Sequence, residues 1–467
     1  ISLYKSEFQH NYNKIYGSSL RDKIFAYTGK INKLIQPYRA VYNYLFSNKL
    51  IGFLLKKGLK ISSKRSIPKL EKSLYKNLKI RKIENEIKSV YLYLDEFTNY
   101  IETDIGTDCV YLLEKLGYKV NILQPTESGR TYISKGFLDN AKKCAIIPGS
   151  GSSAMEAVAR QFGTDKKCLV VRNGNFSYRW SQIFESAANA RSTTVVKARM
   201  IGNESVAPFR PADVDDVIEK IKEEKPNIVF APHVETSAGV ILPDDYIKKI
   251  STAAHEVGAL MVLDCIASGC VWVDMEDCGV DVLISAPQKG WSASPSAGLV
   301  MLSRRALDRI EKTNSDSFAI DLKKWLSIMQ TYENGGHAYH ATMPTDALRA
   351  FRDTVLETRE YGYEKLKLAQ WELGNKVRKY LSQKGIKSVA AEGFTAPGVV
   401  VSYTHDSEIQ NGSKFAAKGM QIAAGVPLAC DEPEDFKTFR LGLFGLDKLY
   451  NVEGTFKRLT MVLDQVL

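Results

Sequence analysis

Cysteine and histidine are scarce in this sequence, with seven and six residues among 467. The cysteines are an odd number, and their spacing fits neither a disulfide-rich framework nor the paired ligands of a structural zinc site. We therefore predict no disulfide scaffold, no bound metal and a reducing, cytoplasmic setting. Cys265, Cys270 and Cys278 lie closest together, and their spacing favours small buried side chains over zinc ligands.

Long hydrophobic runs are also missing. The stretch LIGFLL at 50–55 is far shorter than the roughly 20 residues that a membrane-spanning helix needs. The first residues, ISLYKSEFQH, include neither a starting Met nor the apolar run of a signal peptide. No internal repeat or low-complexity tract is present. The sequence therefore predicts neither a membrane anchor nor a targeting segment.

Acidic residues are scarce only in the first third of the chain. Residues 1–143 contain 26 Lys and Arg against 13 Asp and Glu, whereas the remaining residues contain 38 against 40, so the net charge of +11 arises before residue 144. Through the Lys-rich residues 49–82, Leu and Ile recur at roughly helical intervals, which is typical of amphipathic helices with a solvated face. We therefore predict no nucleic-acid or membrane partner, although such binding is the alternative interpretation of this charge.

The hydrophobic pattern predicts an α/β protein. A content of 44% hydrophobic and 25% charged residues is typical of a soluble globular chain of two to four domains. Residues 1–89 are expected to be helical, followed by a short β-α-β-α unit with elements at 89–94, 105–117, 119–123 and 132–143. From residue 144 onward strands and helices alternate, which favours a mostly parallel sheet with helices on both faces. Its strands are expected at 144–148, 168–172, 227–232, 260–265, 281–285 and 298–303, and its helices at 152–162, 176–188, 213–224, 243–257 and 304–312.

After about residue 345 the pattern changes to that of a smaller α+β domain. A long helical stretch with breaks is expected over 345–385, and strands are expected at 398–404 and 438–445.

Three polar features follow strands of the predicted sheet, at the edge where such sheets bind ligands. GSGSSAMEA at 149–157 joins glycines to the start of a helix, whose free N–H groups favour a phosphate. The alternative interpretation of this Gly-Ser run is an ordinary turn. Asp264 ends a very apolar strand, where a carboxylate needs a cation unless it caps a helix. Lys289, preceded by Gln288, follows another strand and fits an enclosed amine, against the ordinary interpretation of a solvated loop residue.

A phosphate cradle, an isolated acid and an enclosed lysine are together what pyridoxal 5′-phosphate requires. The lysine amine forms an imine with the cofactor aldehyde, and a helix N-terminus holds the phosphate. The carboxylate keeps the pyridine nitrogen protonated, so that the ring withdraws electrons from a substrate carbanion. The sequence therefore predicts pyridoxal 5′-phosphate as the cofactor.

Residues 144–467 resemble the class V aminotransferases of fold type I, particularly alanine–glyoxylate and serine–pyruvate aminotransferases. The resemblance is carried by GSGSSAMEA at 149–157, HVETSAGVILP at 233–243, DCIAS at 264–268, SAPQKGWSASPSAGLVMLS at 285–303, HAYHATMPTDALR at 337–349 and RLGLFG at 440–445. It implies a seven-stranded, mostly parallel sheet in a large domain over 144–345 and a small C-terminal α+β domain over 346–467. Because His233, His337 and His340 fall inside these motifs, we assign none of them to a metal.

The resemblance also implies how the cofactor is held. Lys289 resembles the lysine that forms the Schiff base and then moves a proton between the substrate α-carbon and the cofactor. Asp264 resembles the partner of the pyridine nitrogen. Gly151, Ser152 and Gln288 resemble the residues that bind the phosphate.

Further residues are implied around the cofactor ring and the substrate. Ser237 resembles the residue beside the ring hydroxyl, and Phe176 stands near the position where the family often stacks a Trp on the ring, with Tyr178 and Trp180 close in sequence. Tyr339 and Thr342 would reach the phosphate from the neighbouring subunit, so a homodimer is implied. Arg440 resembles the arginine that grips the substrate carboxylate, and an ordinary strand-edge arginine is the alternative.

Residues 1–143 resemble instead the C-terminal, cysteine-rich-type domain of bacterial FAD-linked oxidases with iron–sulfur subunits, through 91–120 and 127–143. Glu127, Ser128 and Gly129 replace the paired-cysteine turn of that domain type, and Cys109 is the only cysteine before residue 144. One thiolate cannot hold an iron–sulfur cluster. Since nothing here resembles the opening segment of class V aminotransferases, we predict a chimeric chain whose transamination is slow.

The predicted function is transamination between a small L-amino acid of the alanine or serine type and glyoxylate or pyruvate. Two alternatives stay open. One is a non-catalytic fragment or docking module of an FAD/iron–sulfur oxidoreductase, and the other is an aminotransferase for another donor, such as an aminophosphonate. The sequence does not choose the donor, because one methylene in a pocket is worth only about 1–3 kcal/mol.

Overall fold

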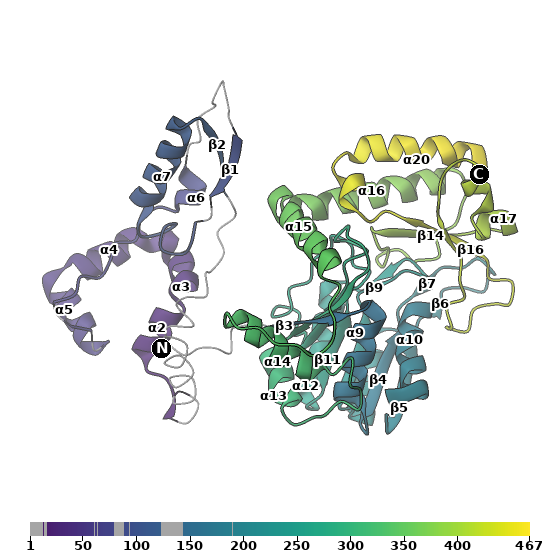
Figure 1. The fold of residues 1–467 in the computed structure, drawn as a ribbon, viewed down its shortest axis with the longest axis horizontal. Coiled ribbons are helices and arrows are strands. Elements are labelled where there is room, and N and C mark those ends of the chain that lie inside the picture. The colour runs from purple at the N-terminus through teal and green to yellow at the C-terminus, as the bar shows by residue number, and fades with distance from the viewer. Residues whose placement is uncertain are drawn as a thin grey trace. The chain divides into compact units, whose positions relative to one another are not determined.

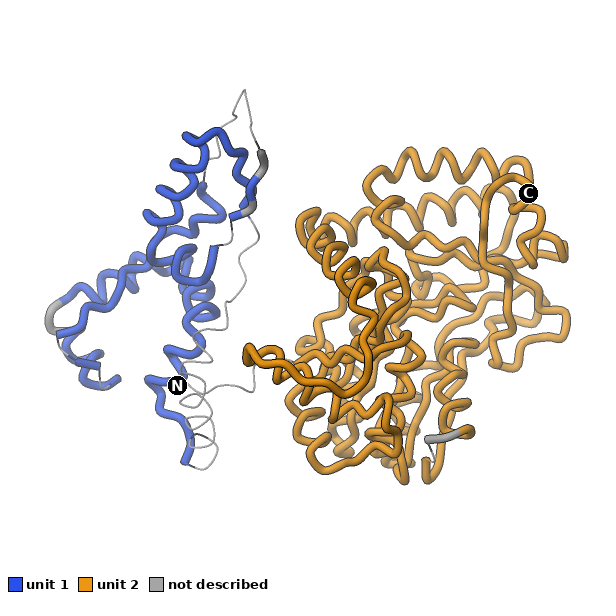
Figure 2. Tube along the Cα trace, in the orientation of Figure 1, with its two compact units in different colours: residues 1–141 blue, residues 142–467 orange. Residues whose placement is uncertain are grey.

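The computed structural model describes residues 13, 16–59, 61–62, 64–78, 88–92, 94–122, 143–188 and 190–467. The chain divides into two compact units, residues 1–141 and 142–467 (Figure 2). None of the described helices is both long enough and apolar enough to cross a bilayer.

The first unit consists of short helices followed by a parallel strand pair. The helices are α2 (Leu20–Ala26), α3 (Thr28–Ile35), α4 (Arg39–Ser47), α5 (Lys49–Gly58) and α6 (Leu74–Asn77). Helix α7 (Thr103–Lys115) connects β1 (Lys88–Leu92) to β2 (Tyr118–Ile122), and the two strands pair in parallel. These three elements confirm the predicted β-α-β order. The helix predicted at 132–143 lies outside the described residues except for Lys143, which begins a strand of the second unit.

The small core of the first unit gathers around Leu74, Leu94 and Val110, which are all buried. Cys109 in α7 is a free, half-buried thiol. Glu127, Ser128 and Gly129 lie outside the described residues. The likeness of this unit to an oxidoreductase domain stays a prediction.

A seven-stranded sheet forms the centre of the second unit, in the order β3-β13-β12-β11-β8-β4-β5. The strands are β3 (Lys143–Pro148), β4 (Lys167–Arg172), β5 (Ser192–Lys197), β8 (Ile228–Pro232), β11 (Leu260–Asp264), β12 (Val282–Ser285) and β13 (Ala297–Leu302). Strand β13 pairs antiparallel with both of its neighbours, and the other pairs are parallel. The predicted mostly parallel sheet is confirmed.

Helices cover both faces of this sheet because successive residues of its strands point to opposite sides. On one face Val170, Val262 and Ile284 pack with α9 (Gly151–Val158), α10 (Asn175–Ile183), α13 (Arg304–Ile310) and α14 (Leu322–Glu333). On the other face Leu169 and Leu263 pack with α11 (Val214–Glu224) and α12 (Asp244–Glu256). This alternation explains why the central strands β8, β11 and β12 are almost continuous apolar runs.

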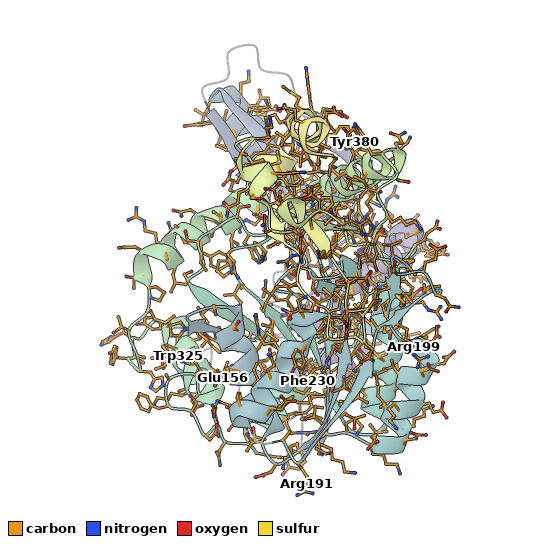
Figure 3. The ribbon with its side chains drawn as sticks, turned by 90° about the vertical axis from the view of Figure 1, so that its right-hand side faces the viewer. Glu156, Arg191, Arg199, Phe230, Trp325 and Tyr380 are labelled. Carbon is orange, nitrogen blue, oxygen red and sulfur yellow. The ribbon has the colours of Figure 1, made fainter. Side chains whose placement is uncertain are left out.

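Aromatic side chains fill the first of these two cores. Phe230 lies 4.5 Å from Trp180 and 5.4 Å from Phe184 between ring centroids. Figure 3 labels Phe230 and Trp325, which belong to this core. It also labels Tyr380, which belongs to the C-terminal part of the unit, residues 346–467.

Besides the two-residue strands β6 (Arg199–Met200), β7 (Phe209–Arg210), β9 (Val234–Glu235) and β10 (Val240–Ile241), two longer elements of the large lobe, residues 143–345, were not predicted from the sequence. Strand β5 was not predicted, although its sequence STTVVK is rich in β-branched residues, which are typical of strands. It lies at the edge of the sheet, where β4 is its only partner among the described strands, and its half-exposed side chains give a weaker apolar pattern. Helix α14 was also not predicted.

The small lobe, residues 346–467, places helices against a three-stranded antiparallel sheet. Its elements are α15 (Thr345–Tyr361), α16 (Tyr363–Gln383), β14 (Val399–Tyr403), β15 (Ala423–Ala424), β16 (Thr438–Gly442) and α20 (Val452–Val466). The predicted break in the long helical stretch falls at Gly362, whose φ of +104° favours glycine. Helices α16 and α20 lie side by side in Figure 1, and their apolar faces share one core with the sheet.

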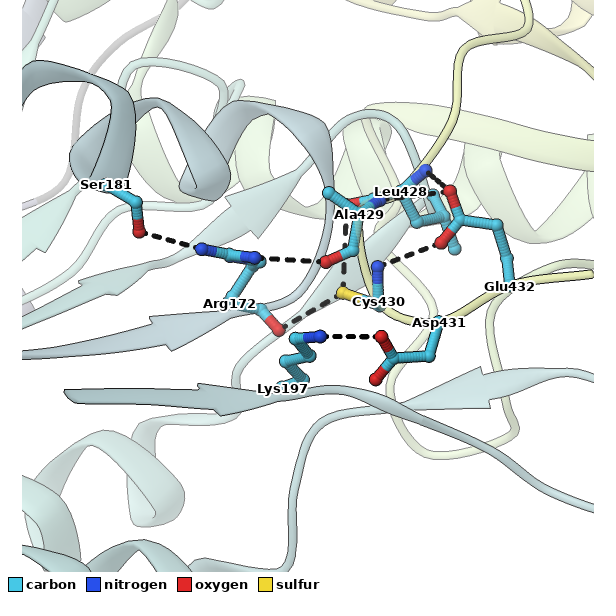
Figure 4. Close-up of polar contacts among 8 residues, drawn as sticks. All are labelled: Arg172, Ser181, Lys197, Leu428, Ala429, Cys430, Asp431 and Glu432. Atoms are coloured by element: carbon cyan, nitrogen blue, oxygen red, sulfur yellow. Dashed lines mark hydrogen bonds and ion pairs between the residues drawn. The ribbon is translucent and has the colours of Figure 1, made fainter. Parts of the chain in front are cut away.

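A loop of the small lobe at 428–432 is bonded to the large lobe (Figure 4). The Arg172 guanidinium donates to the carbonyl of Ala429 at 3.3 Å, and Lys197 forms an ion pair with Asp431 at 2.6 Å. The Glu432 carboxylate accepts from three backbone N–H groups within the loop, at 2.6 to 3.0 Å. These bonds hold the loop against the ends of β4 and β5.

Candidate active site

The predicted site residues follow strands that end at one edge of the seven-stranded sheet. Asp264 is the last residue of β11, and it pairs in register with Ile284 of the adjacent parallel strand β12. The loops that follow these two strands touch, because a Cβ at Gly290 would lie 2.2 Å from the carbonyl oxygen of Gly269. Only glycine allows this approach. Lys289 is thereby held at the same edge as Asp264.

Lys289 is a half-buried amine without an acidic partner. Its Nζ lies 5.7 Å from the centroid of the Phe444 ring, and no acidic side chain in the described part of the chain forms an ion pair with it. Burial lowers the pKa of Lys289, and the nearby Arg440 charge lowers it further. Both effects favour the neutral amine, which is the nucleophilic form.

Asp264 is a buried acid that forms no ion pair with a lysine or arginine of the described residues. Its side chain is 9% exposed, and one oxygen accepts from the backbone N–H of Ile266 at 2.9 Å. Burial raises the pKa of Asp264 to about 7, and the charge of Glu235 also raises it, whereas the backbone bond and Arg179 lower it. A protonated base placed against this carboxyl would restore its charge, as a pyridine nitrogen requires.

We expect the raised pKa of Asp264 to make the cofactor-free protein less stable as the pH rises. Between about pH 4 and 7 the folded protein keeps a proton that the unfolded chain releases at an ordinary pKa of 3.8, so the free energy of unfolding falls with pH in this window. Asp264→Asn removes this contribution. The difference in the free energy of unfolding between the variant and the wild type should therefore be roughly 3 kcal/mol more favourable to the variant at pH 8 than at pH 5. Denaturant unfolding at the two pH values measures it.

The exposed Asp308, which pairs with Arg304 at 2.9 Å, supplies the control for this comparison. Asp308→Asn should follow the wild-type pH profile within about 0.5 kcal/mol. Parallel profiles for wild type and Asp264→Asn would show that Asp264 is ionised in the folded protein.

The predicted phosphate turn lies between β3 and α9. A Cβ at Gly151 would lie 2.5 Å from the Ile266 side chain, so this first residue of the helix is pressed against the loop that follows Asp264. The Ser152 hydroxyl accepts from the Arg179 guanidinium at 2.8 Å. Gln288 has a buried amide oxygen that no donor among the described residues reaches. The turn therefore joins a helix N-terminus, which favours an anion, to an arginine that the sequence analysis did not assign.

Phe176 lies between two guanidinium groups. The centroid of its ring is 5.4 Å from Cζ of Arg179 and 5.6 Å from Cζ of Arg440. Arg440 donates from Nε to the Ala424 carbonyl at 2.8 Å, and among the described residues its two terminal nitrogens have no acceptor. Burial lowers the pKa of Arg440, although Glu235 opposes this effect. Phe176 thus links the arginine of the phosphate turn to an arginine that is open to a ligand.

Ser237 lies at the N-terminus of α10. Its hydroxyl accepts from the backbone N–H of Asn175 at 2.9 Å and donates to Glu235 at 2.7 Å. A Cβ at Gly174 would lie 2.1 Å from this hydroxyl, so α10 can approach Ser237 only through glycine. The sequence analysis also missed Glu235, and the motif HVETSAG offered its position but no role.

Tyr339 and Thr342 are not brought to the other predicted residues within this chain. They lie between α14 and α15, where the Tyr339 side chain is 77% exposed and its hydroxyl is 3.4 Å from that of Thr342. Cys265, Cys270 and Cys278 are free, buried thiols, as predicted, and burial raises their pKa values.

A sheet of this topology, with a lysine and an acid at its carboxyl edge, is the arrangement of fold type I aminotransferases. The chain belongs to the class-V aminotransferase family, which matches residues 117–418. The match begins at residue 117, whereas the sequence resemblance was placed from residue 144. It therefore includes β2 of the first unit.

Among curated proteins, the chain is similar to alanine–glyoxylate aminotransferase 1 of Saccharomyces cerevisiae, with 27% identity over 54% of this chain and 65% of the yeast protein. It is 28% identical to the alanine–glyoxylate aminotransferase of Rattus norvegicus, over 52% of this chain and 56% of the rat enzyme. The chain thus matches less than two thirds of the length of these two relatives. Serine–glyoxylate aminotransferase of Hyphomicrobium methylovorum is 25% identical over 67% of this chain and 75% of that protein.

Solved structures share the fold. A ureidoglycine–glyoxylate aminotransferase from Bacillus subtilis aligns with a TM-score of 0.56 and 23% identity, covering 69% of this chain and 80% of that one. An alanine–glyoxylate aminotransferase from Nostoc sp. aligns with a TM-score of 0.56 and 20% identity, covering 69% and 81%. These likenesses confirm the predicted fold type.

Proposed function

We propose that this protein is a pyridoxal 5′-phosphate-dependent aminotransferase. The observation that carries the proposal is that Lys289 and the buried acid Asp264 lie at the same edge of the sheet. Lys289 is half-buried and forms no ion pair with an acidic side chain of the described residues. The residues present fit the cofactor, because the Arg179 guanidinium reaches the Ser152 hydroxyl at the start of a helix, where a cation and backbone N–H groups favour a phosphate. The cofactor, when bound, withdraws electrons from the substrate α-carbon.

The residues of the site have distinct roles in this proposal. The amine of Lys289 would hold the cofactor at its aldehyde carbon and would move a proton to and from the substrate α-carbon, for which a lowered pKa is suited. Asp264 supplies the charge that keeps the pyridine nitrogen protonated. Gly151, Ser152 and Gln288 hold the phosphate, and Phe176 stacks on the ring. These roles follow from the family, and the contacts of Arg179 with Ser152 and with Phe176 support them.

The proposed substrates are a small L-amino acid of the alanine or serine type and a small 2-oxo acid, glyoxylate or pyruvate. The names of the relatives support glyoxylate as the acceptor. The open guanidinium of Arg440 supports a carboxylate substrate.

A donor screen tests the proposed function. Full-length protein saturated with pyridoxal 5′-phosphate is incubated with alanine, serine or 2-aminoethylphosphonate against glyoxylate and against pyruvate, and the new amino acid is quantified. We expect turnover with alanine or serine. Turnover with the aminophosphonate alone would contradict the proposed donor, and turnover with none of them would contradict the function.

We also propose that the active protein is a homodimer in which Tyr339 and Thr342 reach the phosphate of the neighbouring subunit. Their exposure on one chain, away from the other site residues, supports this arrangement. Tyr339→Phe removes one hydrogen bond to a charged group and should weaken cofactor affinity about ten- to hundred-fold. Light scattering and cofactor titration measure the two properties separately.

The control for the dimer is the exposed Tyr332 of α14. Tyr332→Phe should leave cofactor affinity unchanged. A monomeric protein that binds the cofactor as tightly as its Tyr339→Phe variant would contradict the dimer.

We propose three functional regions for the chain. Residues 1–143 are an oxidoreductase-like remnant without cluster ligands, residues 144–345 bind the cofactor, and residues 346–467 complete the substrate site. The division of the chain near residue 142 and the position of Arg440 in the small lobe support this assignment. The reducing, cytoplasmic setting is part of the same proposal, which the free thiols support.

A further inference from the structure

Glu235 is a fully buried carboxylate that no lysine or arginine of the described residues neutralises. It ends strand β9 (Val234–Glu235), which follows β8 and pairs antiparallel with β10 (Val240–Ile241). A buried charge is costly unless hydrogen bonds replace the lost hydration. The side chain of Glu235 is held entirely by such bonds.

Five hydrogen bonds converge on this carboxylate from two short segments. One oxygen accepts from the backbone N–H of Phe176 at 3.2 Å, and from the backbone N–H and hydroxyl of Ser237 at 3.1 and 2.7 Å. The other oxygen accepts from the backbone N–H and hydroxyl of Ser177 at 2.8 and 2.7 Å. Because Phe176 and Ser177 begin helix α10, the helix dipole also favours a negative charge here.

The two segments are those that carry the proposed ring contacts. Phe176 is fixed through its backbone, and Ser237 is fixed through both its backbone and its hydroxyl. The hydroxyl proton of Ser237 points to Glu235, while its oxygen accepts from Asn175. One carboxylate therefore sets the position of an aromatic ring and the direction of a hydroxyl group.

The charge of Glu235 also reaches the rest of the site. It opposes the ionisation of Asp264, and it favours the charged form of Arg440. Its removal should therefore change the electrostatic environment of both Asp264 and Arg440.

We propose that Glu235 is a positioning residue, which orients Phe176 and Ser237 toward the ring of the cofactor without touching the cofactor itself. This inference rests on the proposed function. A Gln at this position has nearly the same shape, but its amide group can accept through only one atom and turns a donor toward donors. The ring contacts should then loosen, while the phosphate turn, which is built by other residues, should stay intact.

The test compares two ligands of the cofactor-free, full-length protein. Pyridoxal 5′-phosphate is titrated by quenching of tryptophan fluorescence, and inorganic phosphate is titrated by competition with it. We expect Glu235→Gln to weaken the affinity for the cofactor about ten- to hundred-fold and to change the circular dichroism of the bound cofactor. The affinity for inorganic phosphate should change less than twofold. Glu235→Asp, which keeps the charge, should recover part of the loss.

Glu432 provides the matched control, because its carboxylate also accepts from three backbone N–H groups but belongs to the loop at 428–432 (Figure 4). Glu432→Gln should lower the unfolding midpoint without changing either affinity.

The outcomes separate this inference from the proposed function. Equal losses of cofactor and phosphate affinity in Glu235→Gln, or unfolding of both Glu235 variants, would make Glu235 a purely structural residue and overturn this inference alone. Wild-type protein that takes up no cofactor would overturn both proposals.

Discussion

Lys289→Ala should abolish the borohydride-reducible bond between the protein and pyridoxal 5′-phosphate, and it should lower the rate of transamination by roughly 10²- to 10⁴-fold or more. The amine is both the nucleophile and the proton carrier in the proposed function, so its removal affects two steps. The phosphate turn at Gly151 and Ser152 is built by other elements, and the variant should still bind the cofactor reversibly. Peptide mass after reduction locates the bond, and stopped assays give the rate.

A lysine on the surface of the same lobe serves as the control. Lys220 is exposed and pairs with Glu223 at 3.0 Å, and Lys220→Ala should keep both the reducible bond and the rate. If Lys289→Ala retained a reducible bond at another lysine with an unchanged rate, Lys289 would have no covalent role.

The layers of the second unit could be predicted because each buried strand is nearly all apolar. Val170, Val262 and Ile284 point to one face and their neighbours to the other, so both sides need helices. Strand β5 could not be predicted from an apolar run, because an edge strand buries only part of each side chain. The dividing point of the long C-terminal helix is set by the backbone of Gly362, and the pattern of side chains shows such a break only approximately.

The chemistry of Lys289 and Asp264 could be predicted because an ionisable residue after an apolar strand is unusual. Arg179 and Glu235 carried no such signal. Each acts through a partner distant in sequence, Ser152 for Arg179 and Phe176 for Glu235, and only the fold brings these pairs together. Polar residues that hold other residues in place therefore leave no pattern in the sequence by which they could be predicted.

The position of Arg440 predicts the second large effect, on the substrate and not on the cofactor. Its Nε donates to the Ala424 carbonyl at 2.8 Å, which fixes one edge of the guanidinium group. The two terminal nitrogens have no acceptor among the described residues, and burial already lowers the pKa of the guanidinium. A carboxylate in this place gains two parallel hydrogen bonds to a partly desolvated cation.

Arg440→Ala should therefore lower kcat/KM for donors with a carboxylate by about ten- to more than a hundred-fold, since hydrogen bonds to charged groups contribute about 1.5–3 kcal/mol. Arg440→Lys keeps the charge but not the paired geometry, and it should recover only part of this loss. The affinity for pyridoxal 5′-phosphate should stay near the wild-type value in both variants. Arg199→Ala, which removes an exposed ion pair with Asp216 at 2.9 Å, should change neither property. Loss of the cofactor from Arg440→Ala, with unchanged donor kinetics in the holoenzyme that remains, would instead make Arg440 a residue that supports Phe176, whose ring it contacts at 5.6 Å.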